Sequence, residues 1–210
     1  MCLQFAVRQT AMHNQTTREI ESFVEATHRP ATLIELLDQR ALHLPDQLAY
    51  TFLLDGETSE VHLTYRELRR RARAIAAALR FAGAKGERAL LLFPPGLDFI
   101  EGFFGCLYAG VVAVPVYPPD PAKLNRTLPR LQAIIADAQS SIVLTTSPIL
   151  AMAKLIFAEA PDLKALHWIA TDMVVTSIEE DWQPEHALSS DLAFLQYTSG
   201  STGNPRGAGS

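Results

Sequence analysis

The sequence predicts an α/β fold with a mostly parallel sheet flanked by helices and an early β-hairpin. Short apolar segments alternate with helical segments from residue 88 to residue 170, which is the rhythm of repeated βαβ units. An Asp55-Gly56 pair lies upstream between two strand-like segments, and Asp-Gly is a strong hairpin signal. With 48% apolar residues among 210, the chain can bury a substantial core.

The first predicted helix and the hairpin follow from capping and turn residues. Thr32 stands three residues before Glu35, the spacing of a capping box, so a helix begins there and ends before Pro45. The two hairpin strands are residues 47–54 and 58–64.

The second predicted helix begins at Thr64, which forms another capping box with Glu67. Leu68, Ile75 and Leu79 mark its apolar face, and Gly83 is a fitting C-terminal stop. A cluster of arginines on this helix is interpreted as a solvated face: Arg66, Arg69, Arg70, Arg71 and Arg73.

The βαβ region begins with a strand at 88–93, a Pro94-Pro95-Gly96 turn, a helix at 97–110 and a strand at 111–116. The remaining predicted elements are helix 124–138, strand 141–145, helix 148–160, strand 165–170 and strand 192–196. In the last strand, neighbouring apolar residues occupy opposite faces, which is typical of a parallel strand covered on both sides.

A loop rich in glycine and hydroxyl groups follows this strand, where residues 197–207 read YTSGSTGNPRG. Two glycines let the backbone turn its N–H groups toward one point, and the hydroxyls can bind phosphate oxygens or Mg²⁺. Arg206 adds a fixed positive charge. Neither the P-loop spacing nor the Gly-x-Ser-x-Gly of serine hydrolases is present, which favours phosphate binding without a serine nucleophile. The alternative is an ordinary Ser/Thr/Gly-rich linker.

This loop resembles the ATP-phosphate loop of the adenylate-forming (AMP-binding) superfamily, and residues 63–68, LTYREL, resemble that family's first conserved helix. The resemblance implies ATP and Mg²⁺ as cofactors and an arginine at 206 where the family usually has a lysine. It also implies that residues 30–210 are an incomplete N-terminal part of the large adenylation domain, behind a weakly structured arm at 1–29. The implied ATP-binding residues are Thr198, Ser199, Gly200, Ser201, Thr202, Gly203 and Arg206.

Within that superfamily, residues 110–119, GVVAVPVYPP, resemble the fatty acyl-AMP ligases, as do residues 93–99 and 126–138. Such a ligase converts a fatty acid and ATP to an acyl-adenylate and pyrophosphate, then passes the acyl group to an acyl carrier protein. The family's catalytic residues are expected downstream of residue 210, so the chain is expected to be the inactive N-terminal segment of such an enzyme. An acyl-CoA synthetase segment and a non-catalytic remnant or interaction module remain as alternatives.

Other sites and locations are disfavoured. A net charge of −5 argues against a nucleic-acid partner, and the six histidines show no paired metal spacing. Cys2 and Cys106 stand far apart, so a reducing compartment is the simpler interpretation. The apolar stretch 99–117 is interrupted by glycines and a proline, which favours a buried helix and strand over a membrane span. The cytoplasm is therefore the expected location.

Overall fold

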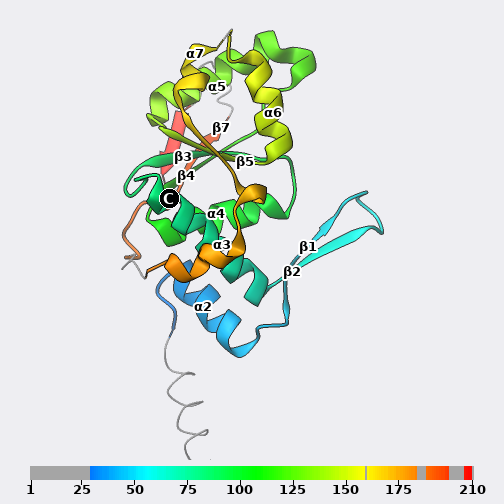
Figure 1. The fold of residues 1–210 in the computed structure, drawn as a ribbon, viewed down its shortest axis with the longest axis vertical. Helices are drawn as coiled ribbons and strands as arrows, with labels where there is room; N and C mark the ends of the chain where they lie inside the picture. The colour runs from blue at the N-terminus through cyan, green and yellow to red at the C-terminus, as the bar shows by residue number, and fades with distance from the viewer. Residues whose placement is uncertain (1–28, 159, 184–187, 199–205, 210) are drawn as a thin grey trace, which may run out of the picture.

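The computed structural model describes residues 29–158, 160–183, 188–198 and 206–209. A four-stranded parallel sheet lies between two layers of helices, with α3 and α4 on one face and α5, α6 and α7 on the other (Figure 1). The α-helices are α2 (Leu33–His43), α3 (Tyr65–Phe81), α4 (Leu97–Ala109), α5 (Leu124–Ala138), α6 (Ser147–Ile156) and α7 (Pro161–Ala165). Short 3₁₀ segments are η1 (Pro121–Lys123), η2 (Thr171–Met173) and η3 (Thr176–Asp181). The predicted α/β class is confirmed.

The strands form three separate sheets. The parallel sheet has the order β4-β3-β5-β6, and two antiparallel pairs, β1-β2 and β7-β8, stand beside it. Their bounds are β1 (Leu48–Leu53), β2 (Glu60–Thr64), β3 (Arg88–Leu92), β4 (Val112–Val116), β5 (Ile142–Thr145), β6 (His167–Ala170), β7 (Leu195–Thr198) and β8 (Arg206–Gly209).

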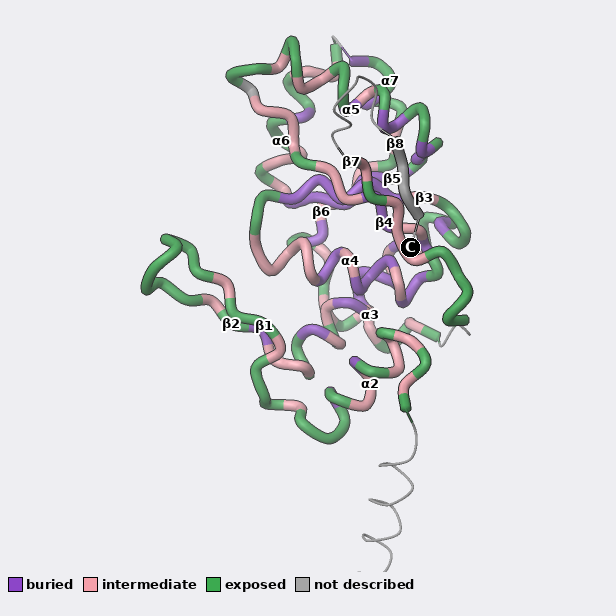
Figure 2. Tube along the Cα trace, turned by 180° about the vertical axis from the view of Figure 1, so that it is seen from behind, coloured by how far each residue is buried: buried purple, intermediate pink, exposed green. Residues whose placement is uncertain are grey.

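Alternation along β3 produces two cores, one on each face of the sheet. Ala89 and Leu91 pack in the cluster built with α3 and α4, whereas Leu90 and Leu92 pack in the cluster built with α5 and α7. The four side chains are essentially inaccessible, and the two central strands, β3 and β5, form the buried centre of the molecule (Figure 2). Strands buried on both faces read as continuous apolar runs, as residues 89–93 do.

Helices α3 and α4 pack very closely. A Cβ added to Gly105 of α4 would lie 2.5 Å from Cγ2 of Ile75 on α3, so only glycine allows this approach.

The Arg71 side chain links α3 to neighbouring segments through hydrogen bonds. It donates to Oε2 of Glu101 at 2.9 Å and to the carbonyl oxygens of Thr171 and Val174, each at 3.1 Å.

The prediction that the arginines of α3 form a solvated face is wrong for three of them. Arg71 pairs with Glu101, while Arg69 and Arg73 both pair with Asp38 of α2. Tyr108 also donates to Asp38, at 2.8 Å. The sequence pattern of the helix could not indicate these partners, because they come from distant segments that only the tertiary fold brings to α3.

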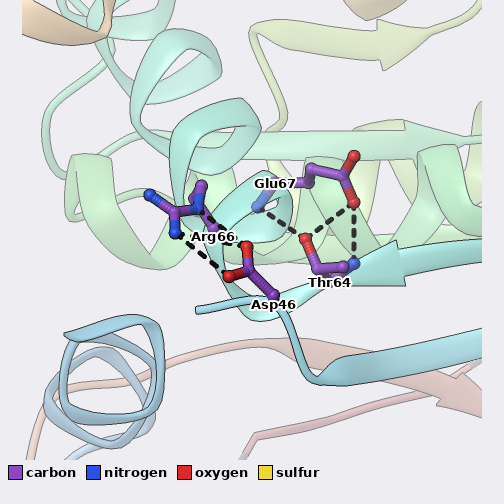
Figure 3. A network of polar contacts seen from close by, with 4 residues as sticks. All are labelled: Asp46, Thr64, Arg66 and Glu67. Carbon is purple, nitrogen blue, oxygen red and sulfur yellow. Dashed lines mark hydrogen bonds and ion pairs between the residues drawn. The ribbon is translucent and has the colours of Figure 1, made fainter. Parts of the chain in front are cut away.

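The capping box at the start of α3 is confirmed (Figure 3). Thr64 Oγ1 accepts from the Glu67 amide at 3.3 Å, and Oε2 of Glu67 accepts from the Thr64 amide at 2.9 Å. The Thr64 amide and hydroxyl both donate to Oε2 of Glu67, and these two bonds hold the pKa of Glu67 below its usual value, because they favour the charged carboxylate. At α2 the box is incomplete, since Glu35 accepts from the amide of Ala31 rather than from that of Thr32.

The β1-β2 hairpin is also confirmed, and it projects away from the body of the molecule (Figure 1). Asp55 organises its turn by accepting from the amides of Glu57, Thr58 and Ser59, each at 2.9 Å. These three bonds lower the pKa of the Asp55 carboxyl well below its ordinary value.

Two predicted elements differ from the structure. The expected helix 148–160 ends at Ile156, and a separate short helix begins at Pro161, where proline is well tolerated at a helix start. The expected strand 192–196 lies at Leu195–Thr198 and is not a full member of the parallel sheet. Phe194, the residue before it, makes one bridge to Ala113 of β4, and the strand itself pairs with β8.

Candidate functional site

A cleft of about 480 Å³ lies at the carboxyl ends of β3 and β4. Its walls include the turn after β3, Pro94 to Gly96, and the turn after β4, Tyr117 to Pro119. These turns were singled out in the sequence, and the fold brings them together. Proline at each exit fixes the backbone and stops the strand from continuing.

The position of this cleft follows from the topology. The chain leaves β3 toward α4 on one face, whereas it leaves β4 toward α5 on the other face. Adjacent parallel strands whose connections go to opposite faces leave a crevice between their carboxyl ends, which is where open α/β sheets bind ligands.

The cleft combines an apolar wall with positive charge. Leu91, Phe99 and Ile134 contribute apolar surface, and Arg126 and Arg130 stand one turn apart on α5. No Asp or Glu is among the described residues that line it. Within the described part of the chain, neither arginine makes a hydrogen bond or an ion pair. The cleft can therefore receive an anion that carries an apolar portion.

These two arginines were not predicted as site residues. The signal available in the sequence was their i, i+4 spacing on a helix that follows a proline-rich turn. That spacing places two charges on one helix face, but it does not show that the face lines a cleft. The strand order had to be known first.

The β7-β8 hairpin lies beside this cleft. Gln196 and Tyr197 of β7 line it, and the single bridge to β4 is parallel, so β7 runs toward the same edge of the sheet. At the far end of the hairpin, Thr198 and Arg206 are partners in register.

The predicted phosphate-binding residues are partly described. The hairpin brings the backbones of Thr198 and Arg206 opposite each other, so the segment between them begins and ends at one place. The other predicted residues lie outside the described part of the chain: Ser199, Gly200, Ser201, Thr202 and Gly203. Strand β8 was not predicted, because its sequence RGAG has few of the β-branched and aromatic residues that favour strands.

Among the described residues, no group of three or more His, Cys, Asp and Glu side chains could hold a metal ion. Cys106 is a free, fully buried thiol in α4, and burial raises its pKa far above the ordinary value, so it is no nucleophile. Among the described helices, none combines the length with the apolar character needed to cross a bilayer.

Curated relatives match most of this chain, although the chain matches only a part of each. It is 48% identical over 178 residues to the medium-chain-fatty-acid (acyl-carrier-protein) ligase JamA of Moorena producens, covering 84% of this chain and 30% of JamA. It is 36% identical over 169 residues to the long-chain-fatty-acid–AMP ligase FadD32 of Mycolicibacterium smegmatis, covering 77% of this chain and 26% of FadD32.

Solved structures agree with the fold. The fatty acyl-adenylate ligase from L. pneumophila, solved with acyl adenylate and pyrophosphate, matches with a TM-score of 0.73 and 41% identity. The match covers 85% of this chain and 30% of that one. The family described as AMP-binding enzyme matches residues 37–209, which include the cleft and the β7-β8 hairpin. This chain therefore belongs to the AMP-binding enzyme family.

Proposed function

We propose that the chain is the part of a fatty acyl-AMP ligase that binds ATP phosphates and a portion of the acyl substrate. The complete reaction joins a fatty acid to the α-phosphate of ATP, releases pyrophosphate, and passes the acyl group to an acyl carrier protein. The observation that carries this proposal is the meeting of the cleft and the β7-β8 hairpin at one edge of the sheet. The identity with JamA and FadD32 supports the choice of a fatty acid as substrate.

The proposed phosphate site answers an electrostatic problem. A carboxylate that attacks ATP brings negative charges together, so the site must supply donors and cations around the triphosphate. Arg206 would supply the charge beside backbone N–H groups and hydroxyls. The residues proposed to hold the β- and γ-phosphates are Thr198, Ser199, Gly200, Ser201, Thr202, Gly203 and Arg206.

Mg²⁺ is proposed to accompany ATP at this site, where it would offset phosphate charge. Hydroxyl oxygens are hard ligands that suit Mg²⁺, which usually binds through few protein groups and the substrate phosphates. Thr198 and its neighbouring serines supply such oxygens.

The cleft is proposed to hold an apolar, anionic part of a substrate. Arg126 and Arg130 would balance its charge, since a guanidinium matches carboxylate and phosphate geometry. An acyl carrier protein, named as the acceptor in JamA, is the proposed partner. This chemistry requires ATP and carrier proteins, so we place the enzyme in the cytoplasm.

Binding of phosphate tests the first part of the proposal. We expect the chain to bind Mg²⁺-pyrophosphate and Mg²⁺-ATP in isothermal titration calorimetry, and the variant Arg206→Gln to bind both more weakly. A matched control is Arg66→Gln, which removes an exposed arginine that is not among the residues lining the cleft. Equal affinity of wild type and Arg206→Gln would contradict the assigned phosphate site.

Catalysis is tested in a chimera, because the relatives' activities belong to much longer chains. The chimera is JamA in which the segment that matches this chain is replaced by this chain. We expect ATP–pyrophosphate exchange that depends on a medium-chain fatty acid, followed by transfer of the acyl group to carrier protein. A thioester formed with free CoA instead would identify an acyl-CoA synthetase, and a well-folded chimera without exchange would count against the ligase.

A further inference from the structure

The attachment of β7 to the rest of the molecule changes abruptly along its length. At Phe194 the chain is bridged to Ala113, and the amide of Ala113 donates to the carbonyl oxygen of Ala193 at 3.1 Å. Beyond that point, the backbone of β7 pairs with β8 and not with β4. The last residues of β7 therefore depend on their side chains for a fixed position relative to the sheet.

Two side chains of β7 reach the α5 side of the molecule. Leu195 and Tyr197 pack against the core cluster that α5 shares with the sheet. The Tyr197 hydroxyl then donates to Oδ2 of Asp137, near the end of α5, at 2.5 Å. Hydrogen bonds from a hydroxyl to a carboxylate are short and about twice as strong as neutral ones.

The protonation state of this pair suits a lasting contact. Burial, together with the hydrogen bond to Asp137 and its charge, raises the pKa of Tyr197 to about 12. The phenol thus keeps its proton at neutral pH and can donate throughout the physiological range. Tyr197 immediately precedes Thr198, whose partner in register is Arg206.

We propose that Tyr197 is a positioning residue for the phosphate site, and that its hydrogen bond to Asp137 fixes the end of the β7-β8 hairpin against α5. This inference rests on the proposed function for its consequence, phosphate binding, but its structural part stands on the contact itself. A hairpin held by one backbone bridge can pivot, and a second fixed point at Tyr197 prevents the pivot. The paired backbones of Thr198 and Arg206 then keep their position relative to α5 before a ligand arrives, which lowers the cost of binding.

Hydrogen exchange of the wild-type chain and the variant Tyr197→Phe tests the structural part. Phenylalanine keeps the ring in the α5 core and removes only the hydroxyl. We expect faster amide exchange in β7 and β8 and unchanged exchange in β3 and β5. The control is Tyr50→Phe, which removes a hydroxyl from the projecting β1-β2 hairpin. Unchanged exchange in β7 and β8 of Tyr197→Phe would overturn the proposal, whether or not the chain binds phosphate.

Ligand binding with rescue tests the functional part. We expect Tyr197→Phe and Asp137→Ala to bind Mg²⁺-pyrophosphate about three- to tenfold more weakly, the range of one lost hydrogen bond. Asp137→Asn keeps an oxygen that accepts from Tyr197, so it should bind more tightly than Asp137→Ala. Altered exchange with unaltered affinity would refute the positioning role. Absence of binding by the wild type, by contrast, would remove the proposed phosphate site and leave only the anchoring contact.

Discussion

The parallel sheet and the β7-β8 hairpin meet at one edge of the molecule but are held in different ways. Strand β3 is paired on both sides, and its side chains are buried in two cores. The hairpin follows a single backbone bridge to the sheet, at Phe194, and residues 195–197 are only partly buried or exposed. The sheet fixes where the cleft lies, whereas the hairpin carries the groups proposed to bind phosphate.

This difference teaches that stability and function are supported by separate contacts. Changes around the sheet should alter the free energy of unfolding of the whole domain. Changes at the end of the hairpin should act locally, because few buried contacts depend on it. The three predictions that follow change the helix layer that supports the sheet, and each would weaken this comparison if its effect appeared at the hairpin instead.

The largest loss in the free energy of unfolding is expected from Arg71→Met. The change leaves Glu101 without its partner and removes the donors for two carbonyl oxygens, and the paired side chains are only 19% and 12% exposed. Breaking a buried ion pair on one side costs about 3–5 kcal/mol, so we expect a loss near 3 kcal/mol in urea denaturation. Arg66→Met is the control, because that pair with Asp46 is 60% and 85% exposed and should contribute less than about 1 kcal/mol. Similar losses in both variants would disprove the structural role of Arg71.

A smaller loss in the free energy of unfolding is expected from Gly105→Ala. The added methyl group would meet the branched Ile75 side chain at 2.5 Å and 2.8 Å, and a β-branched residue has little freedom to move aside. Overpacking of this kind costs about 1–3 kcal/mol, although alanine regains part of it through its better helix propensity. A double-mutant cycle with Ile75→Ala measures the clash directly, since the substitution at 105 should cost less when Cγ2 of Ile75 is absent. Additive free energies would show that the two helices do not meet there.

The sequence predicted the elements whose signals are local. Thr64 with Glu67 and the Asp55 turn were foreseen because a cap or a turn depends on residues within a few positions. The partners of Arg71 come from residues 101, 171 and 174, and no local pattern contains that information. The helix was therefore right, whereas the solvated arginine face was wrong for Arg69, Arg71 and Arg73.

The candidate site shows the same division. The turns at Pro94 and Tyr117 were recognised individually, but their meeting depends on β3 and β4 being neighbours. The loop that begins at Thr198 was recognised by its residue types. The pairing of Thr198 with Arg206 could not be recognised from the sequence. It requires strand β8, whose glycine and alanine residues have little strand propensity.

The smallest of the three effects is the contribution of Glu101 to the pH dependence of the free energy of unfolding. Burial raises the pKa of Glu101 above its ordinary value of 4.5, although the Arg71 hydrogen bond and charge act in the opposite direction. The folded state therefore binds this proton more tightly than the unfolded state, so stability falls as pH rises from 4.5 through the raised pKa. We expect the free energy of unfolding of Glu101→Gln to depend less on pH over this window than that of the wild type, as measured by urea denaturation. Asp98 keeps part of the slope in the variant, because burial and the nearby charge of Asp172 raise its pKa too. A Glu101→Gln variant whose stability falls with pH as steeply as that of the wild type would mean that the Arg71 pair offsets the burial of Glu101.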